Sequence, residues 1–218
     1  MISPLSIVVT ATTDLVKSIR TTAGRPLTAL LASLALVGMS SVYAAETSDV
    51  PESLEITSSV LLHHGMVTDE HSAYGENKSI DLNWDNLPEG TVQLAVVCDD
   101  PKVVELGMMP TPFVHWVAYN IPASASGLPA ALPSDAEIAG IEGLEGMING
   151  VNGLGRTGYF GPRPPVNGQL HAYHFRVYAI DADLGLEAGL GRDELLEAID
   201  GHVLATGMLM GHYERKAQ

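Results

Sequence analysis

The stretch "GYFGPRPPVNGQLHAYHFRVYAID", residues 158–181, joins a rigid loop directly to a strand. Its first half is rich in Gly and Pro, two residue types that interrupt strands. Its second half alternates between two faces, and the side chains of one face are His171, Tyr173, Phe175, Val177 and Ala179. The stretch therefore predicts a strand over Leu170–Ile180 that begins with a histidine beside a stiff loop.

Segments of similar character recur along the chain and indicate the fold class. Four of them have the pattern of strands, namely Leu54–Leu62, Ser79–Trp84, Val92–Cys98 and Phe113–Ile121. The one convincing helix is Asp193–Ile199. Residues 122–151 are rich in Gly, Ala and Pro, and we expect a long excursion over the surface. Many short strands with few helices predict a mainly β protein, an antiparallel β-sandwich with a few peripheral helices.

The first 44 residues differ from the rest of the chain. Basic residues precede an apolar run over residues 27–39, and a small-residue pattern ends at Ala44. This order is typical of a secretory signal peptide. The run of 13 residues is shorter than the ~20 that a membrane-spanning helix needs, although an uncleaved anchor is the alternative. We expect a signal peptide over 1–44, a domain over 45–218, and an exported protein, periplasmic or extracellular, without stable membrane insertion after cleavage.

The charge of the chain argues against one class of partner. The full sequence has a formal net charge of −15, and removal of residues 1–44, with three basic residues and one acidic residue, makes it −17. Such a surface repels nucleic-acid backbones and anionic lipid. Nucleic acid is therefore not an expected partner, and an anionic ligand must be held by a few focused donors.

Cysteine and metal-binding motifs are sparse. Cys98 is the only cysteine, so no internal disulfide can form, and its apolar neighbours favour a buried, unreactive side chain. The sequence has no H-E-x-x-H motif and no closely spaced pair of metal ligands. We therefore expect neither a metal nor a cofactor.

Three strand ends each carry a polar side chain on an otherwise apolar face, and these side chains are Asp100, His115 and His171. Strict alternation places His115 on the face of Phe113, Val117 and Tyr119. Taken singly, each residue is most simply a turn cap or a satisfied core histidine. The other histidines are interpreted in that way, or as exposed: His63, His64, His71, His174, His202 and His212.

The loop over Gly158–Pro162 indicates that the three strand ends form one binding site. Its glycines would let a ligand approach the backbone N–H groups closely. Its proline makes the loop rigid before anything binds, which lowers the entropic cost of binding. A stiff loop beside two imidazoles predicts a cradle for an anion.

Four stretches, in order, resemble motifs of the phosphatidylethanolamine-binding protein (PEBP) family, specifically its bacterial Raf-kinase-inhibitor-like branch. They are "CDDPK" (98–102), "FVHWVAYNIPA" (113–123), "GVNGLGRTGYFGPRPPVNGQLHAYHFRVYAID" (150–181) and "ELLEAIDGHVLATGMLMGHYER" (194–215). The likeness covers about residues 54–216, and the third stretch is the most specific. The resemblance implies a compact β-sandwich with a small pocket at the strand ends that takes phosphate-like anions, including phosphoethanolamine head groups.

Carried over residue by residue, the resemblance implies a set of ligand-binding positions: Asp100, His115, Gly158, Tyr159, Gly161, Pro162, His171 and Tyr173. The histidines would donate to anion oxygens. Asp100 would accept from a histidine or from a ligand ammonium, and Tyr173 would supply a hydroxyl or a wall. The expected partner is a phosphate-bearing small molecule, a lipid head group or a phosphorylated protein, and a homodimer is compatible with the resemblance.

The chain departs from the family pattern at three places. Lys102 stands where the family has its second carboxylate, and it either adds a cation to the pocket or is solvated. Ile80 replaces a proline, and the segment over residues 103–112 is idiosyncratic. We expect a non-catalytic binding protein. The alternatives are a metal-assisted or acid/base hydrolase that uses the same Asp/His/His set, and a kinase or protease inhibitor that acts by docking.

Overall fold

The structure, a computed structural model, describes residues 52–217, which belong to one compact unit of the chain, Thr47–Gln218. The expected signal peptide and its cleavage point after Ala44 lie outside the described residues. Among the helices of residues 52–217, none has the length and apolar character needed to cross a membrane.

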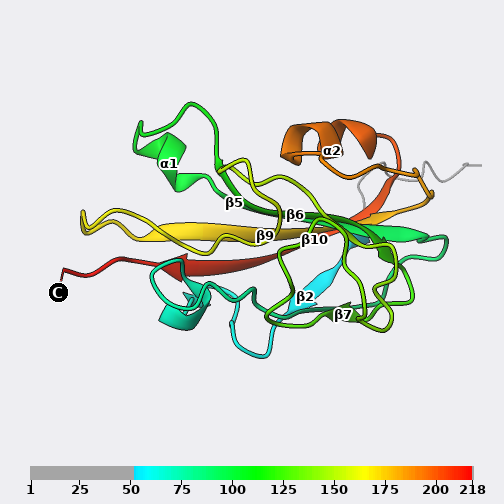
Figure 1. The fold of residues 1–218 in the computed structure, drawn as a ribbon, viewed down its shortest axis with the longest axis horizontal. Coiled ribbons are helices and arrows are strands. Elements are labelled where there is room, and N and C mark those ends of the chain that lie inside the picture. The colour runs from blue at the N-terminus through cyan, green and yellow to red at the C-terminus, as the bar shows by residue number, and fades with distance from the viewer. Residues whose placement is uncertain (1–51, 218) are drawn as a thin grey trace, which may run out of the picture. The chain divides into compact units, whose positions relative to one another are not determined.

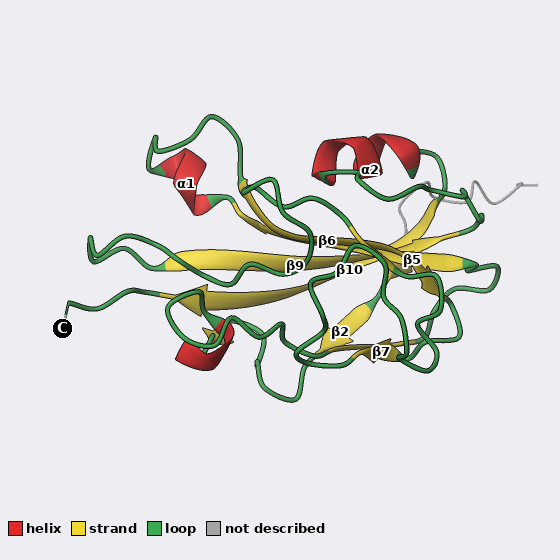
Figure 2. Cartoon of the chain, viewed as in Figure 1, coloured by secondary structure: helices red, strands yellow, loops and turns green. Residues whose placement is uncertain are grey.

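A seven-stranded sheet forms the centre of the domain (Figures 1 and 2). Its strands lie in the order β1 (Glu52–Ser53), β10 (Val203–Tyr213), β9 (His171–Ile180), β5 (Gln93–Asp100), β6 (Phe113–Pro122) and β8 (Ile148–Asn149), and β3 (Gly65–Met66) also pairs with β10. The long strands β10, β9, β5 and β6 are antiparallel to one another, whereas the short β1 and β3 run parallel to β10. The predicted mainly β sandwich is confirmed, with this parallel pairing at one edge.

A second layer covers one face of the large sheet. It contains a three-stranded sheet, β2 (Glu55–Thr57), β4 (Leu82–Asp85) and β7 (Gly127–Leu128), and the short 3₁₀ helix η1 (Asp69–His71). The main core lies between these layers, with Ile80, Leu82 and Trp116 fully buried in it. Figure 1 shows α1 (Lys102–Glu105) and α2 (Arg192–Ala198) on the opposite side of the large sheet, where Leu195 and Ile199 pack on Val97 and its neighbours.

Two expectations from the sequence were wrong in instructive ways. Residues 122–151 do not merely cross the surface, because Leu128, Ile138 and Met147 from this segment are buried in the main core. The expected strand Leu54–Leu62 ends at Thr57, because Ser58 and Ser59 turn to donate hydrogen bonds to the carboxylate of Asp81. The expected helix Asp193–Ile199 is confirmed, shifted by one residue.

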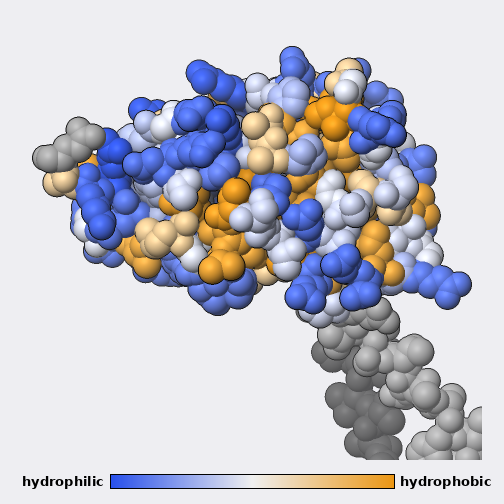
Figure 3. All heavy atoms as spheres, turned by 90° about the horizontal axis from the view of Figure 1, so that it is seen from below, coloured by the Kyte–Doolittle hydropathy of each residue, from blue (hydrophilic) through white to orange (hydrophobic). Residues whose placement is uncertain are grey.

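The surface is not uniformly hydrophilic. Figure 3, which views the domain from the side of the small sheet, shows apolar side chains exposed among hydrophilic ones. Leu62 and Met66 are among the exposed apolar residues of the domain. Single exposed apolar side chains are ordinary in soluble proteins. Such residues therefore indicate a site here only where polar groups accompany them.

Candidate ligand-binding site

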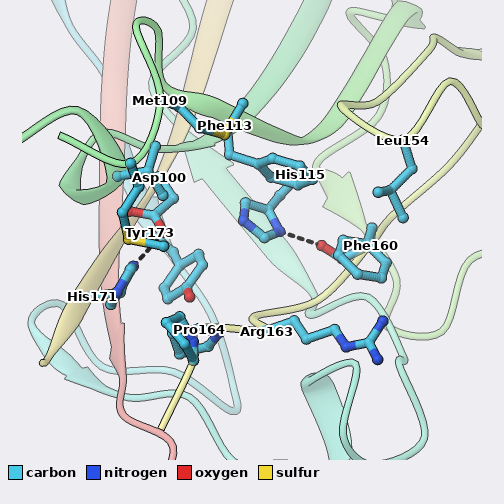
Figure 4. Close-up of a pocket in the computed structure, with 13 residues that line it drawn as sticks. Asp100, Met109, Phe113, His115, Leu154, Phe160, Arg163, Pro164, His171 and Tyr173 are labelled. Atoms are coloured by element: carbon cyan, nitrogen blue, oxygen red, sulfur yellow. Dashed lines mark hydrogen bonds and ion pairs between the residues drawn. The ribbon is translucent and has the colours of Figure 1, made fainter. Parts of the chain in front are cut away.

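A cavity of about 250 Å³ opens at the ends of β5, β6 and β9 (Figure 4). The residues that line it are Asp100, Val103, Met108, Met109, Phe113, His115, Leu154, Phe160, Arg163, Pro164, Pro165, His171 and Tyr173. Its walls are largely apolar, and its polar groups are few and nearly all buried. This composition is typical of small-molecule sites, in which a few polar groups fix the orientation of a ligand.

Asp100 and His171 form a buried pair on one side of the cavity. Nδ1 of His171 donates to Oδ2 of Asp100 over 2.6 Å, and both side chains are almost completely buried. The other carboxylate oxygen accepts from the backbone N–H of Lys102, which fixes the start of α1. Burial raises the pKa of Asp100, and the hydrogen bond and charge of His171 oppose that shift. Asp100 is thus both a turn cap and the residue that orients the His171 ring.

His115 reaches the cavity because β6 contains a β-bulge. Cys98 pairs with Trp116, but the next residue of β5, Asp99, pairs with Val114, so His115 is the extra residue. A bulge re-aims a side chain. His115 and Trp116 therefore both point toward the small-sheet side, whereas Val117 packs on the α2 side. The expectation that His115 shares a face with Val117 and Tyr119 was wrong, since strict alternation fails at the bulge.

The His115 ring is held in a defined tautomer. Its Nδ1 lies 2.5 Å from the carbonyl oxygen of Phe160, so Nδ1 carries the hydrogen (Figure 4). Burial lowers the pKa of His115 from 6.5 to about 4. Near neutral pH the ring is therefore uncharged, and its Nε2 is a hydrogen-bond acceptor. This differs from the expected donor role, because the one N–H of the neutral ring is already used.

Two buried polar atoms at the cavity have no hydrogen-bond partner among residues 52–217: Nε2 of His171 and the hydroxyl of Tyr173. Both residues line the cavity, and both are only 1% exposed. The Tyr173 ring also contacts the His115 ring edge to face, with 5.0 Å between centroids. A buried polar atom without a partner is costly. A ligand oxygen in the cavity would relieve that cost for both atoms.

The Gly158–Pro162 loop supports the cavity without lining it, except at Phe160. A Cβ on Gly161 would overlap the carbonyl of His71, so this glycine makes room for the chain itself. The N–H of Gly161 donates to Asn77, which removes the backbone donor expected for an anion. The hydroxyl of Tyr159 donates to the carbonyl of His71 inside the core.

The remaining two residues of this loop are also engaged by protein groups. The carbonyl of Gly158 accepts from the Asn152 side chain, and that of Pro162 accepts from Ala73. The geometry therefore does not place four residues of the loop for direct contact with a ligand, because each of them packs against its own chain: Gly158, Tyr159, Gly161 and Pro162.

Sequence reasoning missed several residues that line the cavity. Arg163 is exposed at the cavity and is the only Lys or Arg among its lining residues. Arg163 lies between Pro162 and Pro164, next to the Gly158–Pro162 loop. A cation directly beside this stiff loop was the signal in the sequence that could have identified it. Lys102 does not line the cavity, since its ammonium pairs with Glu105 over 2.7 Å. Met108 and Met109 come from the idiosyncratic segment over residues 103–112, and no motif indicated them.

The relatives of this chain were identified by sequence and by structure. The family model described as phosphatidylethanolamine-binding protein matches residues 57–214. A UPF0098 protein from Pyrococcus horikoshii is 33% identical over 187 residues, which cover 86% of this chain and 88% of the relative. A UPF0098 protein from Methanothermobacter thermautotrophicus is 37% identical over 156 residues, covering 69% of this chain and 92% of the relative.

Two solved structures have a similar fold. A PEBP homologue from Chlamydia trachomatis superposes with a TM-score of 0.65 at 30% identity, covering 76% of this chain and 99% of its own. YbcL from E. coli, described as a member of the mammalian PEBP family, gives a TM-score of 0.66 at 26% identity, with coverages of 75% and 99%. Together with the family match, these relatives show that the chain belongs to the phosphatidylethanolamine-binding protein family.

Proposed function

We propose that this protein is a non-catalytic binding protein that holds a phosphate-bearing ligand in the cavity beside Asp100, His115, His171 and Tyr173. The observation that carries the proposal is the pair of unpartnered buried atoms, His171 Nε2 and the Tyr173 hydroxyl, at one cavity. Native proteins leave few buried polar atoms unpaired, and those that remain call for an explanation. A tetrahedral anion with several acceptor oxygens would pair both.

Each side chain has a distinct role in this proposal. Asp100 accepts from Nδ1 of His171 and orients the ring, and Nε2 of that ring is the atom left to pair with the anion. Tyr173 donates its hydroxyl, and Arg163 adds a cation at the cavity. His115, neutral with a free Nε2, accepts from a protonated phosphate oxygen or takes up a proton when a dianion binds.

Binding is favoured over hydrolysis by the composition of the cavity. No Ser, Thr or Cys is among the residues that line it, so the cavity offers no nucleophile of these three types. Residues 52–217 contain no group of three or more His, Cys, Asp or Glu placed to hold a metal ion. Assay of phosphatase activity and metal content on the purified protein would separate the two readings: turnover with stoichiometric zinc or iron would replace binding by catalysis.

We also propose that the protein is exported, with a signal peptide over residues 1–44 and a domain over residues 45–218. The basic, apolar and small-residue order of the N-terminal segment supports this proposal. N-terminal sequencing of exported material should begin at Ala45. Protein that retains the preceding residues would contradict the cleavage.

The test of the proposed ligand is a thermal shift with two probes. Inorganic phosphate and phosphoethanolamine should each raise the melting temperature, because a ligand that binds only the folded state stabilises it. His171→Ala should abolish the shift. His202→Ala is the matched control, since His202 also pairs with an aspartate, Asp181, over 2.8 Å but lies away from the cavity. An equal shift in the His171→Ala variant would place the ligand elsewhere.

A further inference from the structure

Histidines and methionines gather on the face of the large sheet opposite the cavity, at the end of β10 nearest to the C-terminus (Figure 1). The even-numbered side chains of β9 and β10 project to this face, away from the main core. Six residues from β3, β9, β10 and the turn before β3 form what we call the His/Met group: His63, His64, Met66, His174, Met210 and His212. None of them lines the cavity.

The contacts within the His/Met group bring two kinds of metal ligand together. The ring centroids of His63 and His64 are 4.1 Å apart, and the rings of His64 and His212 stack at 5.8 Å. The register of β3 and β10 pairs Met66 with His212, and paired residues of neighbouring strands project to the same face. Met66 is 54% exposed. Imidazoles and an accessible thioether are therefore adjacent on the surface.

Hydrogen bonds distinguish the histidines of this group. Nδ1 of His63 accepts from a backbone N–H, and Nδ1 of His174 accepts from Arg176, so the hydrogen of each neutral ring is on Nε2. His212 is the reverse, because its Nδ1 donates to the carbonyl of His64 over 3.2 Å and leaves the lone pair of Nε2 free. Metal-binding histidines commonly donate their second ring N–H to a backbone carbonyl in this way.

The backbone at His64 does not require a histidine. Its φ is 62°, in the left-handed region, which is uncommon for a residue with a side chain. The turn is held by backbone groups, since the N–H of His64 donates to the carbonyl of Met210 and that of Gly65 to the carbonyl of Leu62, both over 2.7 Å. The ring itself is exposed. An unusual backbone conformation that presents a ring to solvent is a reason to look for a ligand.

We propose that His64, His212 and Met66 bind a copper(I) ion. A small rotation of the exposed His64 ring would bring one nitrogen of each imidazole to about 2 Å from a single ion. Thioether and imidazole ligands together favour Cu(I) over harder cations. The net charge of −15 also favours a cation.

Other metals fit this surface less well. Residues 52–217 contain no group of three or more His, Cys, Asp or Glu side chains placed to hold an ion, which argues against zinc in its usual form. Cu(I) is bound stably by fewer ligands than the four that structural zinc sites use. The softness of the thioether and the small number of ligands therefore both point to Cu(I).

Competition with bicinchoninate under anaerobic, reducing conditions measures Cu(I) binding to the purified protein. We expect a single ion per chain. His64→Asn should lower the affinity by about tenfold or more without loss of stability in urea, because asparagine adopts a positive φ readily. His174→Gln is the matched control, since His174 lies on the same face but its Nδ1 is engaged by Arg176, and its affinity should stay within about twofold. No Cu(I) binding, an unchanged affinity in His64→Asn, or an equal loss in His174→Gln would overturn the inference.

Met66→Leu tests the thioether at nearly constant volume. X-ray absorption at the copper edge should show a sulfur neighbour in the unaltered protein and none in Met66→Leu, whose Cu(I) affinity should fall about tenfold. A sulfur signal that survives the substitution would contradict the assignment of Met66. The phosphate-induced thermal shift should be the same in Met66→Leu as in the unaltered protein, because Met66 does not line the cavity. Copper binding and the proposed function can therefore each fail without the other.

His212→Gln tests the second imidazole. The amide N–H of glutamine can still donate to the carbonyl of His64, but it supplies no imidazole nitrogen to the ion. Affinity for Cu(I) should fall by about tenfold or more, with the urea midpoint nearly unchanged. Affinity equal to that of the unaltered protein would overturn the assignment of His212.

Discussion

Asp99 and Asp100 are neighbours in the sequence, but their side chains lie on opposite faces of the same sheet. Asp99 is buried on the α2 side, where it pairs with Arg176 at 2.8 Å and with Arg192 at 3.3 Å. Asp100 is buried at the cavity, where it pairs with His171, whose second nitrogen has no partner. The first carboxylate is balanced by two cations of its own chain. The second belongs to a network that ends at a cavity, and this difference separates a structural ion pair from a candidate binding site.

Asp99→Asn should have the largest effect on stability. It leaves two arginines facing a neutral group in a place where the carboxylate is only 2% exposed. We expect a loss of about 3 kcal/mol in the free energy of unfolding, the lower end for a broken buried pair, because both arginines are partly exposed. Urea unfolding measures it. Asp181→Asn, which breaks an exposed pair with His202, should cost less than about 1 kcal/mol; equal costs would remove the contrast.

Acid should destabilise the fold through His115. The pKa of this residue is lowered from 6.5 to about 4, so between these pH values the unfolded chain binds a proton that the folded chain does not. Acidification through that window therefore removes about 1.4 kcal/mol per pH unit, or about 3 kcal/mol in all. The raised pKa of Asp100 acts in the opposite direction.

The His115 contribution can be isolated by substitution. His115→Asn places an amide N–H near the carbonyl of Phe160 but does not titrate. Its free energy of unfolding, measured in urea from pH 7 to pH 4, should fall less steeply than that of the unaltered protein. Parallel pH profiles for the two proteins would show that His115 does not remain neutral in the folded protein over this pH range.

Asp100→Asn should affect binding more than stability. The amide oxygen still accepts from Lys102, but Nδ1 of His171 loses its negatively charged acceptor, which orients the ring toward the anion. We expect affinity for inorganic phosphate to fall about tenfold, which is about 1.4 kcal/mol. In Asp99→Asn the affinity should change little, because that side chain lies on the other face of the sheet. Calorimetry on both variants tests whether the two carboxylates are as separate as their positions indicate.

Arg163→Gln should give the smallest effect. The guanidinium is exposed, so its attraction for an anion is weakened by water and salt. We expect a two- to threefold loss of phosphate affinity at low salt, about 0.5 kcal/mol, that fades at high salt. Arg156→Gln, an exposed arginine outside the cavity lining, is the control. A loss that persists at high salt would point to a direct, desolvated contact.

The alternation of the sequence predicted the faces of two of the three polar residues at the strand ends, and it failed for the third. Alternation on β5 and β9 assigned Asp100 and His171 to the correct face, because both strands are regular where these residues lie. It failed for His115, since a bulge depends on pairing with another strand and leaves no local pattern. The motif still placed His115 at the pocket because the resemblance carried information that alternation did not.

Glycines account for two further differences. Gly161 makes room for His71, which is 90 positions away in the chain, and composition cannot tell whether a glycine admits a ligand or its own protein. Gly207 and Gly211 lie within the continuous strand β10 but interrupt its pattern of side chains, so the sequence did not reveal the second partner of β9 as a strand. A Cβ at Gly207 would overlap the carbonyl of Leu54, which shows that close backbone approach, and not a turn, explains this residue.

The most direct test of the central claim is a crystal structure of the protein soaked in tungstate, a tetrahedral dianion that scatters anomalously. The account predicts an anomalous peak in the cavity, with oxygens within about 3 Å of His171 Nε2 and of the Tyr173 hydroxyl. A cavity without such a peak, or a peak only at a site remote from Asp100 and His171, would contradict it.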